Sequence, residues 1–315
     1  MVKYFRMSFT NQIIVIVGPT ASGKSDIANL YASTNNAEVV SADSMQIYRG
    51  MDIGTGKIMP FEQKVKHWGI DILDPNEAYS AALYQQYARD CFEKIWTNKK
   101  NIVLCGGTGF YIRAAIDDYQ FPKGEQKNNP IRDKYKEYLD INGSKALWEL
   151  LREKDYLSSK LIHQNNTVRV IRALELLHEG KSYASQANNL KNIKQKYNAI
   201  FFGLRVNPDI LNKRINIRVD KMIEKGLLEE VENLLDKGYK QALTAASAIG
   251  YKEIVNYFEN KCTLEEAVDQ IKTASRQYAK RQRTWFNKDK RINWIDYDDV
   301  NPKRAVEQIK KLTFK

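Results

Sequence analysis

The feature that most constrains this chain is a complete phosphate-binding motif near its N-terminus. Residues 18–25 match the pattern G-x-x-x-x-G-K-[ST], between an apolar run at residues 13–17 and a helix-like run at residues 26–32. In a strand, loop and helix of this kind, glycines let successive backbone N–H groups converge on phosphate oxygens. The motif therefore predicts binding of a di- or triphosphate, and it leaves open which compound is bound and what is done with it.

Two side chains of this loop carry specific chemistry. Lys24 places a positive charge beside the phosphates, and the Ser25 hydroxyl is expected to bind Mg²⁺, the cofactor that we predict. The residues expected to bind the phosphates are Gly18, Pro19, Thr20, Ala21, Ser22, Gly23, Lys24 and Ser25.

Charge is distributed unevenly along the 315 residues. Residues 1–100 contain 11 Lys and Arg against 10 Asp and Glu, whereas residues 101–315 contain 39 against 28. This asymmetry favours a polyanionic partner larger than a nucleotide. No apolar run approaches the roughly 20 residues of a membrane span, and the three cysteines are an odd number without C-x-x-C spacing. We therefore expect a cytoplasmic protein that does not bind a membrane, and we expect a monomer.

Apolar runs typical of buried strands alternate with helical periodicity, which favours an α/β fold with a parallel sheet. The expected strands are residues 13–17, 39–40, 102–105 and 201–204. No strand-like run is evident between residues 117 and 196, where the expected helices are residues 131–139, 144–154 and 168–179. From residue 208 onward the pattern is nearly all helical, and it ends in a long basic helix at about 264–286.

This organisation predicts two domains. Residues 1–117 and 200–315 form a P-loop core with a helical C-terminal region, and residues 118–199 form an inserted all-helical domain. Because most of the excess positive charge lies outside the first 100 residues, the inserted domain and the C-terminal helices are the candidates for binding a polyanion.

Polar side chains elsewhere are candidates for the chemistry. Asp43 follows the second strand, at the sheet edge where such folds bind ligands, and could bind Mg²⁺, pair with Lys24, accept a proton, or only cap a turn. Thr108 lies in a second glycine-rich turn, which could close the pocket or be purely structural. Arg214 and Arg218 share a helix face and could clamp a phosphate leaving group, although a solvated basic face explains them as well.

The long basic helix combines positive charge with aromatic side chains. Arg276, Lys280 and Arg283 form one stripe, with aromatic residues interleaved. This combination suits a phosphodiester backbone with splayed bases. Part of the aromatic set is expected to pack in the core, with Trp285 or Phe286 as the buried residue.

Together, these motifs resemble the tRNA dimethylallyltransferase (tRNA isopentenyltransferase) family over residues 18–286. The resemblance is specific because the motifs occur in the family's order along most of the chain. They are residues 18–25, 41–55, 106–113, 169–175, 218–222, 248–253 and 278–286.

The resemblance implies transfer of a dimethylallyl group from dimethylallyl diphosphate to N6 of the adenosine 3′-adjacent to the anticodon in tRNA. It implies that Asp43 is the general base, that Thr108 is a further catalytic residue in contact with the target adenosine, and that the inserted domain grips the anticodon stem–loop. Arg218 is expected to be catalytic because a positive side chain at the phosphate loop would stabilise the departing diphosphate. The residues that the resemblance places on the tRNA are Asp43, Ser44, Met45, Gln46, Thr108, Arg132, Arg169, Arg172, Ser247, Ala248, Ile249, Gly250, Tyr251, Lys252, Lys280, Arg281, Gln282, Arg283, Thr284, Trp285 and Phe286.

The chain departs from the family pattern at three places. Gly56 stands where alanine is usual, and residues 67–70 read His-Trp-Gly-Ile in place of His-His-Leu-Ile. Both lie outside the expected base and phosphate loop. Thr167 and Val168 precede Arg169 where a basic residue is common, which removes a possible phosphate contact of the inserted domain.

Three alternative functions remain to be weighed. An adenylate isopentenyltransferase needs no large basic surface, so the charge balance and the inserted domain argue against it. A P-loop kinase or NTPase predicts nucleotide turnover, which the family motifs oppose. A non-catalytic RNA-binding protein with a decayed phosphate loop is opposed by the intact Lys24, Ser25 and Asp43.

Overall fold

The computed structural model describes residues 11–121, 129–189, 193–239, 242 and 244–313. The chain divides into two compact units, a core unit of Met1–Ile116 and Gln195–Lys315 and an inserted unit of Asp117–Lys194. The core resumes before the predicted residue 200, because the backbone N–H groups of Lys196 and Tyr197 donate to the Ile116 carbonyl and return the chain to the sheet.

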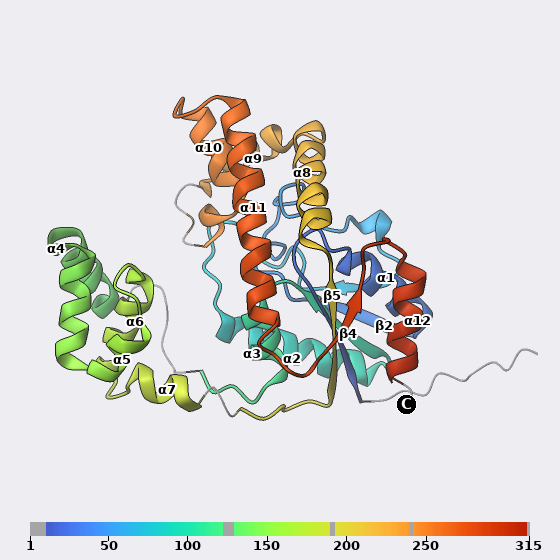
Figure 1. The fold of residues 1–315 in the computed structure, drawn as a ribbon, viewed down its shortest axis with the longest axis horizontal. Helices are drawn as coiled ribbons and strands as arrows, with labels where there is room; N and C mark the ends of the chain where they lie inside the picture. The colour runs from blue at the N-terminus through green and yellow to red at the C-terminus, as the bar shows by residue number, and fades with distance from the viewer. Residues whose placement is uncertain (1–10, 122–128, 190–192, 240–241, 243, 314–315) are drawn as a thin grey trace, which may run out of the picture. The chain divides into compact units, whose positions relative to one another are not determined.

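The core unit is built on a parallel sheet (Figure 1). Its strand order is β3-β2-β4-β1-β5-β6. The strands are β1 (Ile13–Val17), β2 (Ala37–Ser41), β3 (His67–Trp68), β4 (Asn101–Gly106), β5 (Ala199–Arg205) and β6 (Ile292–Asp296). Every residue of β1 is buried, as expected of a central strand that is covered on both faces. The predicted α/β parallel-sheet class is confirmed.

Helices cover both faces of this sheet. On one face Ile14 and Ile16 share a hydrophobic cluster with side chains of α1 (Lys24–Thr34) and α12 (Pro302–Thr313). On the other face the odd-numbered residues of β1 join side chains of α2 (Ala81–Thr97) and α3 (Gly109–Ile116). Because all strands run in one direction, the loops that follow β1, β2 and β4 emerge at the same edge of the sheet.

Both edge strands were missed by the sequence analysis. β3 has only two residues, too few to give a periodic signal. β6 pairs in parallel with β5, so the prediction that the chain is nearly all helical beyond residue 208 is wrong at Ile292–Asp296. Its residues are buried only at Ile292 and Ile295, and its sequence therefore lacks the continuous apolar run of the inner strands.

A helical layer follows β5 in the core unit (Figure 1). It contains α8 (Pro208–Glu224), α9 (Leu227–Asp236), the short η4 (Ala245–Ser247), α10 (Tyr251–Phe258) and α11 (Leu264–Phe286). These helices share a buried cluster with Tyr48 and Met51 from the loop that follows β2. The helical layer therefore packs against that loop and holds it in place. The predicted basic helix at about 264–286 is confirmed, and it begins at a Thr263–Glu266 capping box.

The inserted unit is all helical, with its own core around Leu147, Leu151, Val170 and Leu174. Its helices are α4 (Pro130–Lys154), α5 (Tyr156–Leu161), α6 (Thr167–His178) and α7 (Tyr183–Asn189). Gly143 has a left-handed φ of +79° and interrupts α4, which explains why the sequence predicts two helices there.

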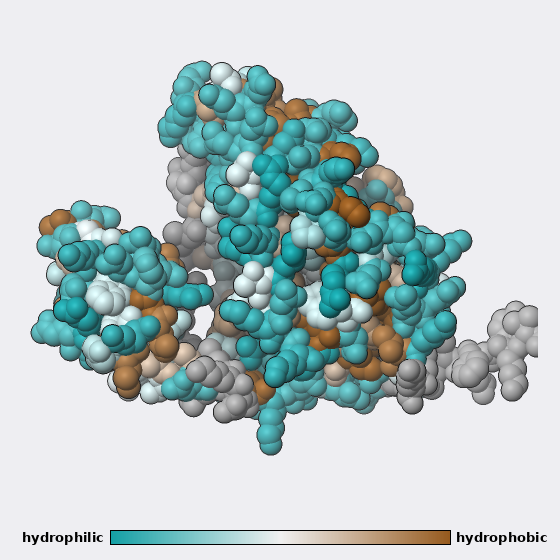
Figure 2. All heavy atoms as spheres, in the orientation of Figure 1, coloured by the Kyte–Doolittle hydropathy of each residue, from teal (hydrophilic) through white to brown (hydrophobic). Residues whose placement is uncertain are grey.

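Hydrophilic side chains dominate the face of the molecule drawn in Figure 2. Within the part of the chain that the structure describes, none of the helices is both long enough and apolar enough to span a bilayer. Cys91, Cys105 and Cys262 are free thiols.

Candidate active site

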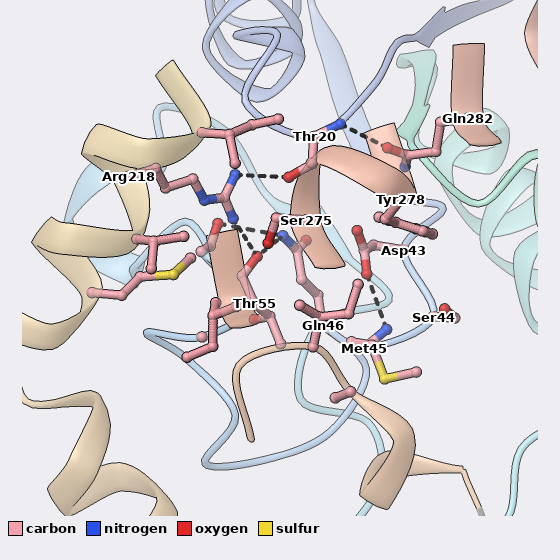
Figure 3. Close-up of a pocket in the computed structure, with 18 of the residues that line it drawn as sticks. Thr20, Asp43, Ser44, Met45, Gln46, Thr55, Arg218, Ser275, Tyr278 and Gln282 are labelled. Carbon is pink, nitrogen blue, oxygen red and sulfur yellow. Dashed lines mark hydrogen bonds between the residues drawn. The ribbon is translucent and has the colours of Figure 1, made fainter. Parts of the chain in front are cut away.

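A cavity of about 330 Å³ lies where the strand-end loops meet the helical layer. Its walls come from the phosphate loop, the loop after β2, α8, residues 247–252 and α11 (Figure 3). The predicted site residues that line it are Thr20, Lys24, Ser25, Asp43, Ser44, Met45, Gln46, Arg218, Ser247, Ala248, Ile249, Lys252, Arg281 and Gln282. The fold thus brings residues from five distant segments to one chamber.

The phosphate loop delivers Lys24 to one end of this cavity. α1 begins at Lys24, directly after Gly23, whose φ is +86°. A Cβ at Gly23 would lie 2.9 Å from the Tyr297 ring, so glycine is required at this turn. Burial lowers the pKa of Lys24, and the nearby Arg218 charge adds to that effect while Asp43 opposes it. Two partly buried positive charges at one place favour an anionic ligand.

Asp43 stands two residues beyond β2, beside the phosphate loop. One of its carboxylate oxygens accepts a hydrogen bond from the Met45 backbone N–H at 3.0 Å, which fixes the side chain in a local turn. Figure 3 shows the other oxygen on the side of Tyr278. The carboxylate is therefore oriented and still has an oxygen that can accept a proton from a bound ligand.

The second glycine-rich turn is joined to the Asp43 loop. Thr108 accepts a hydrogen bond from the Ser44 backbone N–H at 3.1 Å, and its own N–H donates to the Ala42 carbonyl. A Cβ at Gly106 would lie 2.1 Å from that same carbonyl oxygen, so the glycine permits the close approach. Thr108 is thus held against the loop that carries Asp43. It is not among the described residues that line the cavity, and its catalytic role and its contact with the adenosine stay predictions.

Gln282 of α11 bridges the two glycine-rich loops. Its amide oxygen accepts a hydrogen bond from the Thr20 N–H at 2.8 Å, and its amide nitrogen donates to the Gly107 carbonyl at 2.9 Å. The side chain is only 5% exposed. Gln282 therefore positions the phosphate loop, a role that the sequence analysis did not assign to it.

We expect Gln282→Ala to lower the free energy of unfolding by about 1–3 kcal/mol for each buried polar group that it leaves without a partner. Urea denaturation measures this loss. Gln277→Ala is the matched control, because Gln277 is exposed on the same helix. Equal stability of the two variants would show that the bridge contributes nothing.

Arg218 and Arg214 have separate roles, although they share one helix. Arg218 donates to the Thr20 hydroxyl at 3.3 Å and to the Thr55 carbonyl at 3.0 Å, and it faces the cavity. Arg214 instead donates to the carbonyls of Tyr297 and Asp298 just beyond β6. Of the two arginines that the sequence suggests for binding a phosphate leaving group, only Arg218 therefore faces the cavity.

Gly56 lies closer to the chemistry than the sequence analysis assumed. It lines the cavity, and a Cβ there would lie 2.2 Å from the Arg218 guanidinium. The residue that departs from the family pattern therefore packs directly against the cavity arginine.

The remaining residues of α11 and the 247–252 segment divide between surface and interior. Lys280, Arg281, Thr284 and Trp285 are exposed, and Arg283 is half-buried. Gly250, Tyr251 and Phe286 are buried. Phe286, and not Trp285, is therefore the aromatic that packs in the core, in the cluster that α2 and α3 form with one face of the sheet. Tyr251 and Phe286 are therefore interior residues that pack beneath the exposed side chains of these two segments.

In the inserted unit, the predicted RNA-binding arginines differ in their partners and in their exposure. Arg132 and Arg172 both donate to the buried Glu175 carboxylate, at 2.5 Å and 2.9 Å for the shortest bonds. Arg169 is exposed. Arg132 and Arg172 therefore stabilise the unit's own fold by pairing a buried charge, and a role of any of the three toward RNA stays a prediction.

The oxygen donors at the phosphate loop fit a magnesium ion. Mg²⁺ takes oxygen ligands, and it is usually held by one or two protein oxygens, substrate phosphates and water. Ser25 and Asp43 both line the cavity beside Lys24. Among the described residues there is no group of three or more His, Cys, Asp or Glu side chains that could hold a metal ion, so a bound diphosphate would have to supply several ligands.

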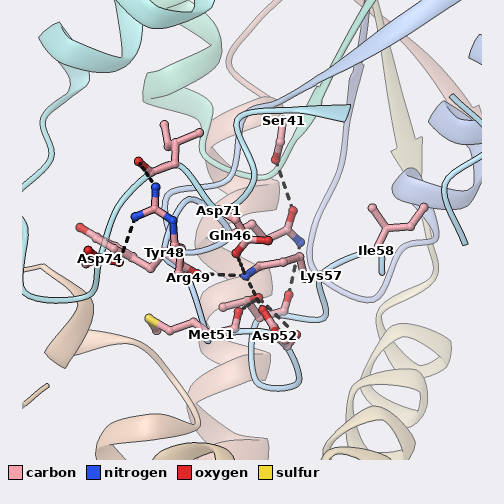
Figure 4. A network of polar contacts seen from close by, with 12 residues as sticks. Ser41, Gln46, Tyr48, Arg49, Met51, Asp52, Lys57, Ile58, Asp71 and Asp74 are labelled. Carbon is pink, nitrogen blue, oxygen red and sulfur yellow. Dashed lines mark hydrogen bonds and ion pairs between the residues drawn. The ribbon is translucent and has the colours of Figure 1, made fainter. Parts of the chain in front are cut away.

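Three residues that shape the site were missed by the sequence analysis. Tyr278 lines the cavity, and burial together with the Asp43 charge raises its pKa to about 12. Glu230 binds the loop after β2 from outside the cavity. Lys57 holds the same loop together, as it donates to the Tyr48 carbonyl and to two carboxylates (Figure 4).

Glu230 and Lys57 lie in patterns that carry no signal of function, and the motif that contains Tyr278 does not show that its side chain faces the cavity. Tyr278 and Glu230 sit within ordinary amphipathic helices, and Lys57 is a lone cation in a loop. Their importance depends on contacts between segments that are far apart in the sequence.

Comparison with known proteins gives consistent matches over nearly the whole chain. Residues 46–289 match the family model described as IPP transferase. The tRNA dimethylallyltransferase of Carboxydothermus hydrogenoformans is 44% identical over 95% of this chain and 96% of its own length. That of Bacillus subtilis is 43% identical over 98% of this chain and 97% of its own length.

Two solved structures also match. A tRNA isopentenylpyrophosphate transferase from Bacillus halodurans is 38% identical, with a TM-score of 0.71 and 96% of each chain covered. A eukaryotic dimethylallyltransferase described as acting on tRNA is 28% identical, with a TM-score of 0.80 and coverage of 96% of this chain and 80% of its own.

Proposed function

The chain belongs to the IPP transferase family, and we propose that its cavity brings dimethylallyl diphosphate together with the adenosine 3′-adjacent to the anticodon of a tRNA. It is an enzyme that transfers a dimethylallyl group to tRNA, the activity that its relatives' names state. The observation that carries the proposal is a single cavity in which one oriented carboxylate, Asp43, lies beside two positive side chains, Lys24 and Arg218.

Asp43 is the general base in this proposal. The exocyclic N6 of adenine is a poor nucleophile, because its lone pair is delocalised into the ring. As the bond from N6 to the allylic carbon forms, one N6 proton passes to the Asp43 carboxylate. The hydrogen bond from the Met45 N–H supports this role, because it holds the carboxylate in place while one oxygen is left to accept the proton.

The phosphate end of the cavity stabilises the leaving group. The bond between the allylic carbon and the diphosphate oxygen breaks, and the electron pair leaves with the diphosphate. Lys24, Arg218 and the backbone N–H groups of the phosphate loop lie where that negative charge develops. When bound, Mg²⁺ adds further positive charge at the departing diphosphate, and we propose the Ser25 hydroxyl as its protein ligand.

Apolar side chains that line the same cavity are suited to the allyl group. Ile215, Val219 and Met222 of α8 and Ile271 of α11 line the same cavity. Apolar side chains at this place exclude water from the reacting carbon. An adenine stacked in an anticodon loop does not reach a chamber of this kind, so we propose that the target base is flipped out of the stack and enters beside Asp43.

The tRNA lies on the basic surface of α11 in this proposal. Lys280 and Arg283 are on the predicted basic stripe, and neither has an acidic partner among the ion pairs of the described residues. The exposed Arg169 of the inserted unit is a further candidate for contact with the stem–loop.

We expect the double variant Lys280→Gln/Arg283→Gln to weaken tRNA binding and to flatten its salt dependence. The slope of log K against log salt should fall by about 0.7–0.9 for each RNA phosphate that the variant no longer neutralises. Lys303→Gln/Lys311→Gln is the control of equal charge, because both lysines are exposed on α12, which packs against α1. An equal change in slope for both double variants would place the RNA elsewhere.

A competition assay separates this function from its alternatives. The protein is incubated with dimethylallyl diphosphate, Mg²⁺, ATP, AMP and an anticodon stem–loop, and the masses of the products are measured by mass spectrometry. We expect a dimethylallyl mass gain on the RNA alone. A gain on AMP would indicate an adenylate isopentenyltransferase. No gain on either acceptor, with consumption of added ATP, would indicate a kinase or NTPase.

A further inference from the structure

The side chain of Glu230 in α9 joins two segments that both contribute residues to the lining of the cavity. Its carboxylate accepts hydrogen bonds from three consecutive backbone N–H groups of the loop after β2, at 3.0 Å from Asp52, 2.7 Å from Ile53 and 3.1 Å from Gly54. It also accepts one from the Tyr251 hydroxyl at 2.6 Å. A carboxylate that accepts four hydrogen bonds from two segments holds both segments in register.

The same carboxylate oxygen serves both segments. Glu230 Oε1 accepts from Gly54 and from Tyr251, whereas Oε2 accepts from the other two N–H groups. Burial and the Glu230 charge raise the pKa of Tyr251, so its hydroxyl stays protonated and donates. A displacement of Tyr251 therefore moves the acceptor that also holds Gly54.

Gly54 and the Tyr251 side chain are closely packed. A Cβ at Gly54 would lie 2.4 Å from the Tyr251 ring, so the loop backbone is in direct contact with that ring. Because packed interiors do not deform continuously, a shift of one segment must be taken up by the other.

Contacts continue from this loop to the phosphate end. Thr55, the residue after Gly54, accepts a hydrogen bond from Arg218 at 3.0 Å, and Arg218 also donates to Thr20 of the phosphate loop. Tyr251 itself belongs to the 247–252 segment, four of whose residues line the cavity. An unbroken series of contacts thus runs from that segment to the group that holds the diphosphate.

We propose that Glu230 and Tyr251 are positioning residues that couple the binding of RNA against the 247–252 segment to the binding of the diphosphate by Arg218 and the phosphate loop. The inference rests on the proposed function, because it takes RNA and an allylic diphosphate as the two ligands. Neither residue touches a reacting atom. Their effect is on how strongly each ligand favours the other.

The test measures this coupling directly. The probe is dimethylallyl S-thiolodiphosphate, in which sulfur replaces the oxygen of the bond that breaks. Its dissociation constant is measured by calorimetry with and without a saturating anticodon stem–loop, for the full chain. We expect RNA to tighten binding of the probe at least about fivefold in the unaltered protein, within the usual range for coupled sites.

Two variants and one control make the result specific. Glu230→Gln and Tyr251→Phe should reduce the ratio of the two dissociation constants to near one. Glu229→Gln should keep the full ratio, because Glu229 is the exposed neighbour in the same helix turn. A residue that served only to stabilise the fold would weaken both ligands alone and leave the ratio intact.

If Tyr251→Phe retains the full ratio, or the unaltered protein shows no coupling while it converts RNA to product, the inference is wrong. If Glu230→Gln does not fold, Tyr251→Phe alone decides, because it removes one hydroxyl and keeps the ring that packs on Gly54. Absence of any RNA product from the unaltered protein would overturn the proposed function and would be recognised as a separate failure.

Discussion

Asp43→Asn is expected to lower the rate of dimethylallyl transfer by about 10²–10⁴-fold, the usual contribution of a general base. The asparagine amide oxygen can still accept the hydrogen bond from the Met45 N–H, so the loop should keep its shape. What the variant loses is the group that accepts the N6 proton. Single-turnover rates with saturating RNA and dimethylallyl diphosphate measure the effect without interference from product release.

Two further measurements make this result specific to the base. The affinity for the anticodon stem–loop should be unchanged in Asp43→Asn. Asp236→Asn is the matched control, since Asp236 is exposed at the end of α9, and it should react at the normal rate. A nearly normal rate for Asp43→Asn would remove Asp43 from the role of base.

Lys24→Met should reduce kcat/KM by about 10²–10³-fold, as observed when a preorganised charge-stabilising donor is removed from an active site. The methionine keeps the length of the side chain and removes the positive charge at the first residue of α1. Product inhibition by inorganic diphosphate should weaken as well, because the same charge binds the free leaving group. Both quantities come from steady-state rates with a constant concentration of RNA.

Lys213→Met provides the comparison for this variant, because Lys213 is exposed on α8. It should leave kcat/KM and diphosphate inhibition unchanged. If Lys24→Met lost activity but kept its inhibition by diphosphate, Lys24 would act on a different part of the substrate, and the assignment of the phosphate end would be wrong.

The inner part of the fold is predictable from the sequence because local patterns determine it. β1 and the phosphate loop follow from a continuous apolar run and glycine spacing, and α11 follows from its helical pattern. The edge strand β6 was not predictable in this way. Only two of its residues are buried, and its place is set by parallel pairing with β5.

The candidate site shows the same division. Asp43 and Lys24 could be placed from the rule that ligands bind at the carboxyl ends of parallel strands. Glu230 could not, because its function depends on three backbone N–H groups about 180 residues away in the chain. The resemblance implies that Tyr251 contacts the tRNA, whereas the structure buries its side chain as the partner of Glu230.

The central claim is that this cavity joins an allylic carbon to N6 of one adenosine and releases diphosphate. The most direct test incubates the protein with dimethylallyl diphosphate and an anticodon stem–loop, measures released diphosphate, and digests the RNA to nucleosides for mass spectrometry. We predict one diphosphate released for each N6-dimethylallyladenosine formed, at the adenosine 3′-adjacent to the anticodon. Diphosphate release without modified adenosine, or modification at another atom or position, would contradict the account.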